Sequence, residues 1–204
     1  MSLLYKDETH QYFLDGDELP SVTRILAPLH DFLGIPPAVL QHAADRGRAI
    51  HRAIELDCAN DLDDATLHPE LVPYIQAWRK FFVDWEPEII ATEKRVYHPR
   101  LRYAGTLDAI MQIRGSRYYV DYKATAQLPP TGGLQLKAYQ EADQSQESEP
   151  DRDAKRAVLW LKNDATYRLV EKPDTDWPVF LQLLSQYHTN QKTLSVISKW
   201  KEQK

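Results

Sequence analysis

The spacing of hydrophobic positions along this 204-residue chain predicts helices in its first part and strands in its middle. Residues 3–14 alternate loosely between apolar and polar side chains, which is typical of a short hairpin, and 15–20 is predicted to be the turn that follows. Ser21 stands where the N-cap of a short helix is expected. Apolar residues then recur at helical spacing over 37–58 and 69–85, which predicts two longer helices.

Beyond Pro87 the apolar residues take the alternating spacing of strands. The pattern predicts, in order, strands over 89–98, 101–113 and 116–124, a helix over 132–143, strands over 155–162 and 166–172, and a final helix from Asp174. We therefore expect an α/β protein with a mixed central β-sheet that contains an antiparallel meander and is flanked by α-helices. A single domain is expected, with a hairpin and helical part over 1–86, the sheet core over 87–173 and a C-terminal helix over 174–204.

The composition is that of an ordinary globular protein, with 43% hydrophobic and 27% charged residues. No apolar run approaches the ~20 residues of a membrane span, and the first residues lack the basic start and apolar centre of a secretory signal. Cys58 is the single cysteine, which excludes an internal disulfide, a four-cysteine zinc site and an iron–sulfur cluster. We expect an intracellular protein, without membrane association, in which any metal is held mainly by oxygen and imidazole.

The net charge of −5 gives no overall attraction to nucleic acid but leaves room for a local basic path. Many acidic residues fall in 57–70 and 141–153, which we interpret as solvated loops. Three arginines, Arg46, Arg48 and Arg52, lie on one predicted helix. They either balance nearby acids or contact phosphates.

Two predicted strands carry charged residues where a core strand would be apolar, with Asp108 in one and Asp121 and Lys123 in the next. Between these strands, Gly115-Ser116 fits a two-residue hairpin loop. With that loop, Asp108 lies opposite Lys123 and diagonal to Asp121. All three side chains would then project from the same side of the sheet.

These three charges have two interpretations. A surface salt bridge between Asp108 and Lys123, with Asp121 exposed beside it, would be a common and weak feature. The apolar neighbours on both faces of the strands indicate instead that the charges are partly covered, which is costly unless they pair with one another or with a metal. Carboxylate oxygens suit Mg²⁺ or Mn²⁺. The same loop would place Arg114 opposite Arg117, a like-charge contact that we interpret as a phosphate contact.

Several segments resemble motifs of one nuclease family, in the same order along the chain. GTLDAI (105–110) and VDYKAT (120–125) resemble the D…(D/E)-x-K core of the PD-(D/E)XK nuclease superfamily, and Gly105 gives the G-x-x-D form of its RecB-like branch. Further segments similar to that branch are DRGRAIHRAIE (45–55), ATEKRV (91–96), LQLKAYQEA (134–142) and, as in some phage and organellar exonucleases, SVTRIL (21–26).

The resemblance implies a metal site. Asp108 and Asp121, assisted by the main-chain carbonyl of Tyr122 and by His51, would coordinate one or two Mg²⁺ or Mn²⁺ ions. Without this context His51 would be a half-exposed histidine paired with Glu55 one turn further along its helix.

The resemblance also implies residues that act beside the metal. Lys123 would hold or help to deprotonate the attacking water, and Glu93 would be an extra ligand or an acid supporting the ligands. Gln135 and Tyr139, four residues apart on one helix face, would orient the site or contact DNA. The plainer alternatives are a solvated Glu93 paired with Arg95, and a helix face on which Gln135 and Tyr139 have no special role.

The activity implied is that of a metal-dependent DNA nuclease, and an exonuclease in recombination, repair or phage DNA processing rather than a sequence-specific endonuclease. Its partner would be DNA with linear ends, together with a recombination or single-strand-binding protein or further copies of itself, in the cytoplasm of a prokaryotic or phage-infected cell. Cys58 alone cannot hold the iron–sulfur cluster of some members of the branch. The alternative is a catalytically silent nucleic-acid-binding or assembly module that has kept the fold.

Overall fold

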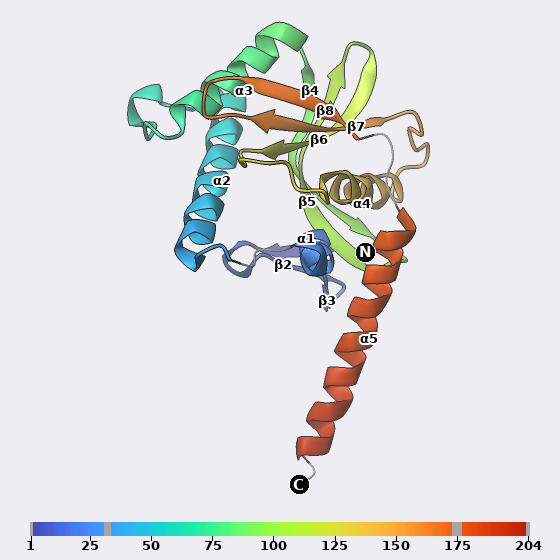
Figure 1. The fold of residues 1–204 in the computed structure, drawn as a ribbon. Helices are drawn as coiled ribbons and strands as arrows, with labels where there is room; N and C mark the ends of the chain where they lie inside the picture. The colour runs from blue at the N-terminus through green and yellow to red at the C-terminus, as the bar shows by residue number, and fades with distance from the viewer. Residues whose placement is uncertain (1, 31–33, 173–176, 203–204) are drawn as a thin grey trace.

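A five-stranded sheet lies at the centre of the computed structural model, which describes residues 2–30, 34–172 and 177–202, with side chains up to 195 (Figure 1). The strands follow one another across the sheet as β4 (Glu88–His98), β5 (Tyr103–Ile113), β6 (Ser116–Lys123), β7 (Lys155–Leu161) and β8 (Tyr167–Glu171). Neighbours are antiparallel, except that β6 and β7 are parallel and are joined through helix α4 (Gly132–Gln144). The predicted mixed sheet with an antiparallel meander is confirmed.

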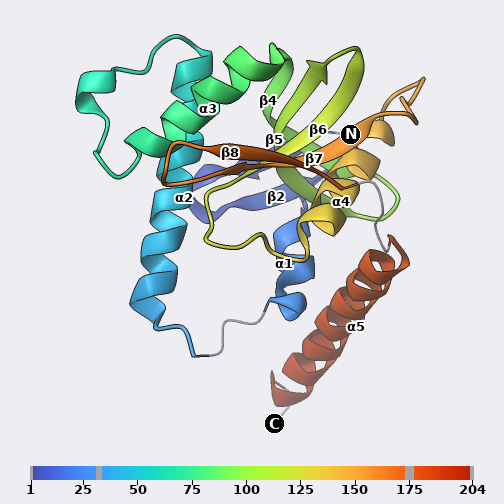
Figure 2. The same ribbon diagram turned by 45° about the horizontal axis from the view of Figure 1, so that its top comes forward.

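Helices cover both faces of this sheet (Figure 2). One face packs against α2 (Pro37–Cys58) and α3 (Val72–Trp85), with Trp78 and Phe81 buried. The other face packs against α4, against α1 (Val22–Leu26) and against Phe180 at the start of α5 (Trp177–Glu202). Burying one large apolar side chain stabilises the fold by about 1.5–3 kcal/mol, so the two faces together account for the layered arrangement.

The start of the chain forms a separate sheet of three antiparallel strands, which are β1 (Leu3–Lys6), β2 (Gln11–Leu14) and β3 (Asp17–Leu19), with the 3-10 turn η1 (Asp7–Thr9) between the first two. The predicted hairpin is confirmed, but the turn expected over 15–20 is shorter, because Asp17–Leu19 pairs with β2. The Tyr12 hydroxyl lies 2.8 Å from Oγ1 of Thr106 on β5. This contact holds the small sheet against the first residues of β5.

The helix boundaries follow local sequence signals. The Ser21 hydroxyl accepts a hydrogen bond from the amide of Arg24, and so caps α1 as predicted. Helix α2 has the predicted bounds and begins at a proline. Helix α3 begins at Val72, three residues after its predicted start. Two further 3-10 turns, η2 (Ala27–Leu29) and η3 (Asp64–Thr66), lie in the connections.

The hairpin between β5 and β6 differs from the prediction by one residue in its loop. Ile113 pairs with Ser116, so Arg114 and Gly115 form the loop, and both have positive φ (48° and 80°). Two residues of this kind are typical of the type I′ turn, whose twist matches that of the flanking strands. Arg117 therefore faces Gln112 and not Arg114. The pairing moves by two residues, which keeps every side chain on its predicted face.

Two predictions about the surface change as well. The acidic segment 141–153 is not a loop throughout, because α4 continues to Gln144 and buries Asp143. The final helix begins, as described, at Trp177, while 174–176 and 203–204 of the predicted helix lie outside the described residues. The C-terminal part of this helix extends away from the rest of the protein (Figure 1). Among the described helices, none has the length and apolar character that crossing a membrane requires.

Candidate metal centre

Three acidic residues form a row across the first three strands of the large sheet. The pairs Thr92–Ala109 and Lys94–Leu107 place Glu93 of β4 opposite Asp108 of β5. Continuing the β5–β6 register beyond Ala109–Val120 places Asp108 opposite Asp121. Asp108 therefore faces an acid on each side, whereas the expected hairpin loop would have placed it opposite Lys123. The three carboxylates are brought together by the strand register.

His51 approaches this row from helix α2. Its Nδ1 lies 3.5 Å from Oδ1 of Asp108 and 3.8 Å from Oε1 of Glu93, and its Nε2 lies 3.3 Å from the carbonyl oxygen of Tyr122. Ligand atoms of His51, Glu93 and Asp108 all lie within 4.8 Å of one another, which is a group that could hold a metal ion. Glu55, the alternative partner of His51, is bound by Arg52 instead.

The two central aspartates are buried and are oriented by neighbours on β6. Asp108 is 7% exposed, and its Oδ2 accepts a hydrogen bond of 2.6 Å from the amide of Tyr122, which leaves Oδ1 toward His51. Asp121 is 1% exposed, and its Oδ1 accepts a 2.9 Å hydrogen bond from Lys123. Its Oδ2 is 2.7 Å from the same ammonium group but has no well-aligned hydrogen bond among the described residues. The salt bridge of Lys123 is thus with Asp121, and not with Asp108.

The charges of this cluster are coupled. Burial raises the pKa of Asp121 to about 6, although the Lys123 ammonium opposes this effect. Burial also raises the pKa of Asp108, against the influence of His51 and Lys123. Burial alone would lower the pKa of His51, but the carboxylates of Asp108 and Glu93 outweigh it and raise that pKa to about 9. The row of acids therefore favours positive charge beside it.

These residues fit a divalent cation. Three carboxylates, one imidazole and the Tyr122 carbonyl form a set of mainly hard oxygen donors, which suits Mg²⁺ or Mn²⁺. The incompletely bonded Oδ2 of Asp121 is a further donor. Glu93 belongs to the tight group with His51 and Asp108, whereas Asp121 does not. Glu93 also has a positive φ of 46°, a sparsely populated conformation that often marks functional sites.

Gln135 and Tyr139 lie beside the cluster on α4. The Gln135 amide donates a 3.0 Å hydrogen bond to the hydroxyl of Tyr139, whose side chain is buried. The Tyr139 ring packs directly on Gly105, so that no β-carbon fits between them. Both residues also line the hollow next to the acids.

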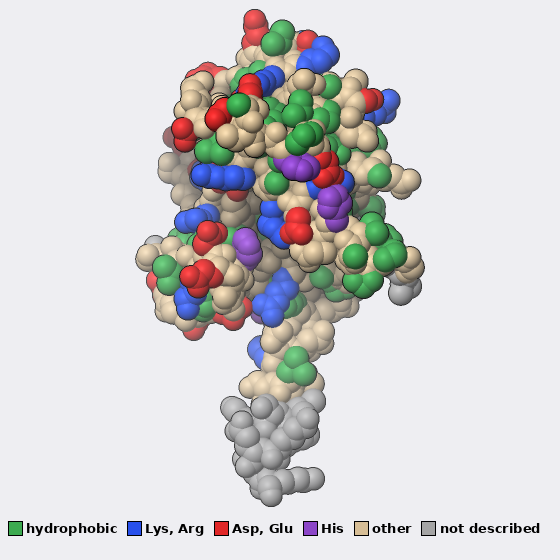
Figure 3. All heavy atoms as spheres, turned by 90° about the vertical axis from the view of Figure 1, so that its left-hand side faces the viewer, with side chains coloured by type: hydrophobic (Ala, Val, Ile, Leu, Met, Phe, Trp, Pro, Cys, Tyr) green, Lys and Arg blue, Asp and Glu red, His purple; other side chains and the backbone are tan. Residues whose placement is uncertain are grey.

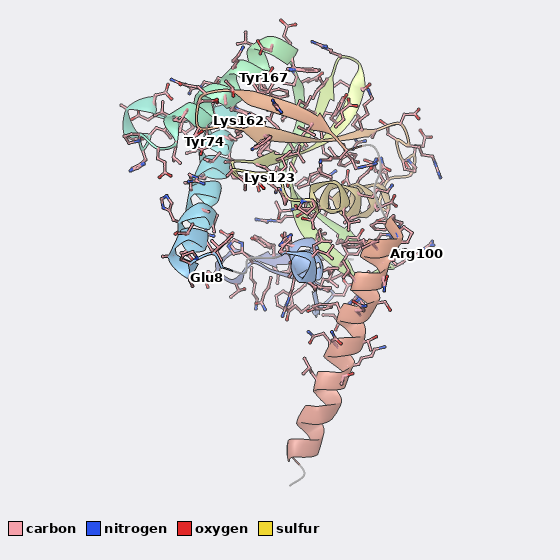
Figure 4. All side chains as sticks on the ribbon, in the orientation of Figure 1. Glu8, Tyr74, Arg100, Lys123, Lys162 and Tyr167 are labelled. Atoms are coloured by element: carbon pink, nitrogen blue, oxygen red, sulfur yellow. The ribbon has the colours of Figure 1, made fainter. Side chains whose placement is uncertain are left out.

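This hollow has a volume of about 1300 Å³ and lies between α2, the small N-terminal sheet and the ends of β5 and β6. The acidic row, His51 and Lys123 all line it, and Figure 4 places Lys123 at the end of β6 between α2 and α4. Figure 3 views the molecule from the α2 side, where Lys and Arg side chains are interspersed with acidic and histidine side chains.

The predicted arginine positions fall into two groups. Three of them line the hollow, and each forms an ion pair with an acidic side chain: Arg46 with Glu70, Arg48 with Asp45, and Arg52 with Glu55. Arg114 and Arg117 do not line it. The guanidinium of Arg114 lies 4.1 Å from the ring centre of Trp85, and Arg117 is bound to Glu147 and Asp143.

Among the residues that line the same hollow, Tyr5 and His10 were not expected from the sequence, and Arg95 was expected only as a partner of Glu93. Arg95 follows Glu93 by two positions in a strand, so the period of two could have placed both on one face. The expected alternative, an ion pair between Glu93 and Arg95, is not among the contacts of the described residues. Tyr5 and His10 had no sequence signal, because only the packing of the small sheet brings them to the site.

No protein-family model and no curated protein matches the chain. Among solved structures, the alkaline exonuclease LHK-Exo from Laribacter hongkongensis is 10% identical, with a TM-score of 0.43 over 89% of this chain and 92% of that one. A second, the protein SSO0001, is 14% identical, with a TM-score of 0.34 over 70% of this chain and 69% of that one. Both TM-scores lie below 0.5.

Proposed function

We propose that this chain is a metal-dependent DNA nuclease, a single-domain hydrolase of phosphodiester bonds that acts as an exonuclease in recombination, repair or phage DNA processing. The observation that carries the proposal is the row of Glu93, Asp108 and Asp121 on adjacent strands, with His51 and Lys123 beside it. The resemblance of the GTLDAI and VDYKAT segments to the PD-(D/E)XK core supports DNA as the substrate.

The metal ligands proposed are Asp108, Asp121, His51 and the Tyr122 carbonyl, with Glu93 as an additional ligand. When bound, Mg²⁺ or Mn²⁺ would lower the pKa of a water molecule and offset the negative charge that builds on the phosphate. The amide of Tyr122 fixes the Asp108 carboxylate at 2.6 Å, so one oxygen remains directed toward His51. Ligands held in this way need little rearrangement when the ion arrives.

Lys123 is proposed to act on the reacting groups. Burial would lower the pKa of its ammonium, but Asp121 and Asp108 outweigh this and raise it, so Lys123 is charged at neutral pH. A charged ammonium would donate hydrogen bonds to the attacking water and to the phosphate oxygens, and so stabilise the transition state. The ion pair with Asp121 at 2.7 Å sets its direction.

DNA would be oriented by residues around this centre. Gln135 and Tyr139 are proposed to position the site from α4. Arg46, Arg48 and Arg52 are proposed as phosphate contacts on the α2 wall. Each would have to exchange its acidic partner for a phosphate. Arg114 and Arg117 remain proposed phosphate contacts at the hairpin, outside the hollow.

The test is cleavage of end-labelled linear DNA and of circular DNA with Mg²⁺, with Mn²⁺ and with a chelator. We expect metal-dependent loss of the linear DNA while the circles survive. Asp121→Asn and Lys123→Ala should each reduce the rate at least a hundredfold, since each removes a group that acts on the developing charge. Asp153→Asn, an exposed acid outside the hollow, is the matched control and should cleave normally.

Cleavage that persists in the chelator, or at an unchanged rate in Asp121→Asn, would exclude the proposed mechanism. Absence of any metal-dependent cleavage by a folded protein that still binds DNA would favour the silent binding module. Equal cutting of circles and linear DNA would make the protein an endonuclease.

A further inference from the structure

Arg95 is an exposed cation beside the acidic row that has no acidic partner among the described side chains. It lies on β4 two residues after Glu93, and both residues line the hollow. The three arginines on the α2 wall are each paired with an acid, so Arg95 differs from them in being available to an anionic ligand.

The Arg95 guanidinium is held by an aromatic side chain from the N-terminal hairpin. It lies 4.4 Å from the ring centre of Tyr5. A planar guanidinium stacked on one face by an aromatic ring still presents its N–H donors in its own plane and leaves its other face open. The contact therefore orients Arg95 without satisfying its hydrogen-bonding groups.

The same tyrosine positions His10. Its hydroxyl lies 2.6 Å from Nδ1 of His10, which has a positive φ of 50° at the end of η1. The Tyr5 ring is in turn supported by Tyr12, with ring centres 4.9 Å apart. Tyr5, His10 and Arg95 thus form one connected group, which we call the Arg95 cluster. His10 is exposed, so its ring is open to stacking.

The Arg95 cluster and α2 both line the hollow. A strand of DNA whose phosphate reaches Asp108 would enter this hollow and so come near both. Of the two acidic residues of η1, Asp7 lines the hollow and Glu8 does not. The Asp7 carboxylate would repel a phosphate bound there.

We propose that the Arg95 cluster is a nucleotide subsite for an unpaired DNA strand, in which Arg95 binds a backbone phosphate and the His10 ring stacks on a base. The proposal rests on the proposed nuclease function. The chemistry favours unpaired nucleotides, because a base inside a duplex has both faces covered by its neighbours and cannot stack on a side chain. A cation near an aromatic platform is the combination by which proteins bind single strands without sequence preference.

The first measurement is the affinity for a fluorescent single-stranded oligonucleotide in a chelator, at several salt concentrations, so that no cleavage occurs. Each phosphate contact to a single strand contributes about 0.7 to the slope of log affinity against log salt. We expect Arg95→Ala to reduce the slope by ~0.7. Arg168→Ala, an exposed arginine on the opposite edge strand β8, should leave it unchanged. Asp7→Asn should strengthen binding.

The second measurement compares single-stranded with duplex DNA. We expect His10→Ala to weaken single-strand binding about five- to tenfold and to leave duplex binding unchanged. Tyr5→Leu removes the contacts with both Arg95 and His10, whereas Tyr5→Phe keeps the ring under Arg95. We expect Tyr5→Leu to weaken single-strand binding more than Tyr5→Phe does. Circular dichroism would establish that each variant is folded.

An unchanged salt slope in folded Arg95→Ala, equal losses for single strands and duplex in His10→Ala, or absence of single-strand binding by the native protein would each overturn the subsite. The two proposals can fail separately. If the native protein shows no metal-dependent cleavage but Arg95→Ala lowers the slope, the nuclease function fails and the subsite stands. Cleavage with an unchanged slope gives the opposite conclusion.

Discussion

Gly105 lies so close to Tyr139 that a β-carbon on the glycine would sit 2.4 Å from Cε1 of the tyrosine ring. This contact joins the strand that carries Asp108 to the helix that carries Gln135. A side chain at position 105 must therefore displace either α4 or the ring, and both lie beside the metal ligands.

We expect Gly105→Ala to lower the free energy of unfolding by about 1–3 kcal/mol, as overpacking of a buried site does. Combining it with Tyr139→Leu should recover part of the loss, because the ring is the atom group in the way, whereas Tyr139→Phe keeps Cε1 and should recover none. Urea unfolding of the single and double variants measures this. Equal rescue by leucine and phenylalanine would contradict the packing account.

The hairpin loop gives a test of the strand register. Arg114 has a φ of 48°, so a β-branched residue there is strained, while asparagine is tolerated. Both replacements lose the contact with Trp85. We expect Arg114→Val to be less stable than Arg114→Asn by about 1 kcal/mol. If Arg114 were a strand residue opposite Arg117, valine would be the more stable of the two.

Asp143 links α4 to two strands, through Lys94 at 2.6 Å and the hydroxyl of Tyr119 at 2.9 Å, with Arg117 at 3.4 Å. Removing one member of a buried ionic group costs about 3–5 kcal/mol, and the partial exposure of Lys94 reduces this, so we expect Asp143→Ala to lower the free energy of unfolding by ~2–3 kcal/mol. Asp153→Ala is the control and should change it little. Equal stability of the two variants would show that the network is weak.

Cys58 provides a pH-dependent prediction. Burial, assisted by the neighbouring Asp57, raises the pKa of its thiol to about 11. Because the thiolate is the reactive form, alkylation by iodoacetamide should be slow at pH 8 and should keep rising about tenfold per pH unit beyond pH 9. The unfolded protein should instead level off near pH 9. A plateau near pH 9 in the folded protein would contradict the burial of this thiol.

Much of the fold follows from local patterns in the sequence. The helix over Pro37–Cys58 and the strand boundaries around Ser116 follow from apolar spacing, proline and turn residues, which act over a few positions. The choice between Gly115-Ser116 and Arg114-Gly115 as the loop was beyond such patterns, since both use the same glycine. The twist of the two strands suits both loops and does not decide between them.

The site was partly predictable for the same reason. Side-chain alternation puts Asp121 and Lys123 on one face in either register. This prediction therefore holds although the predicted loop was wrong by one residue. The burial of Asp143 was not predictable, because its partners Lys94 and Tyr119 come from other strands. The Arg95 cluster depends in the same way on the packing of the small N-terminal sheet against β5.

The central claim is that the acidic row binds a divalent cation, and crystals soaked in Mn²⁺ test it directly by anomalous scattering. We expect an anomalous peak for a Mn²⁺ ion coordinated by the Asp108 carboxylate, with His51 and at least one of Glu93 and Asp121 as further ligands. The peak should be absent from crystals of Asp108→Asn. A native crystal with no peak at Asp108, or with manganese only at surface acids, would contradict the account.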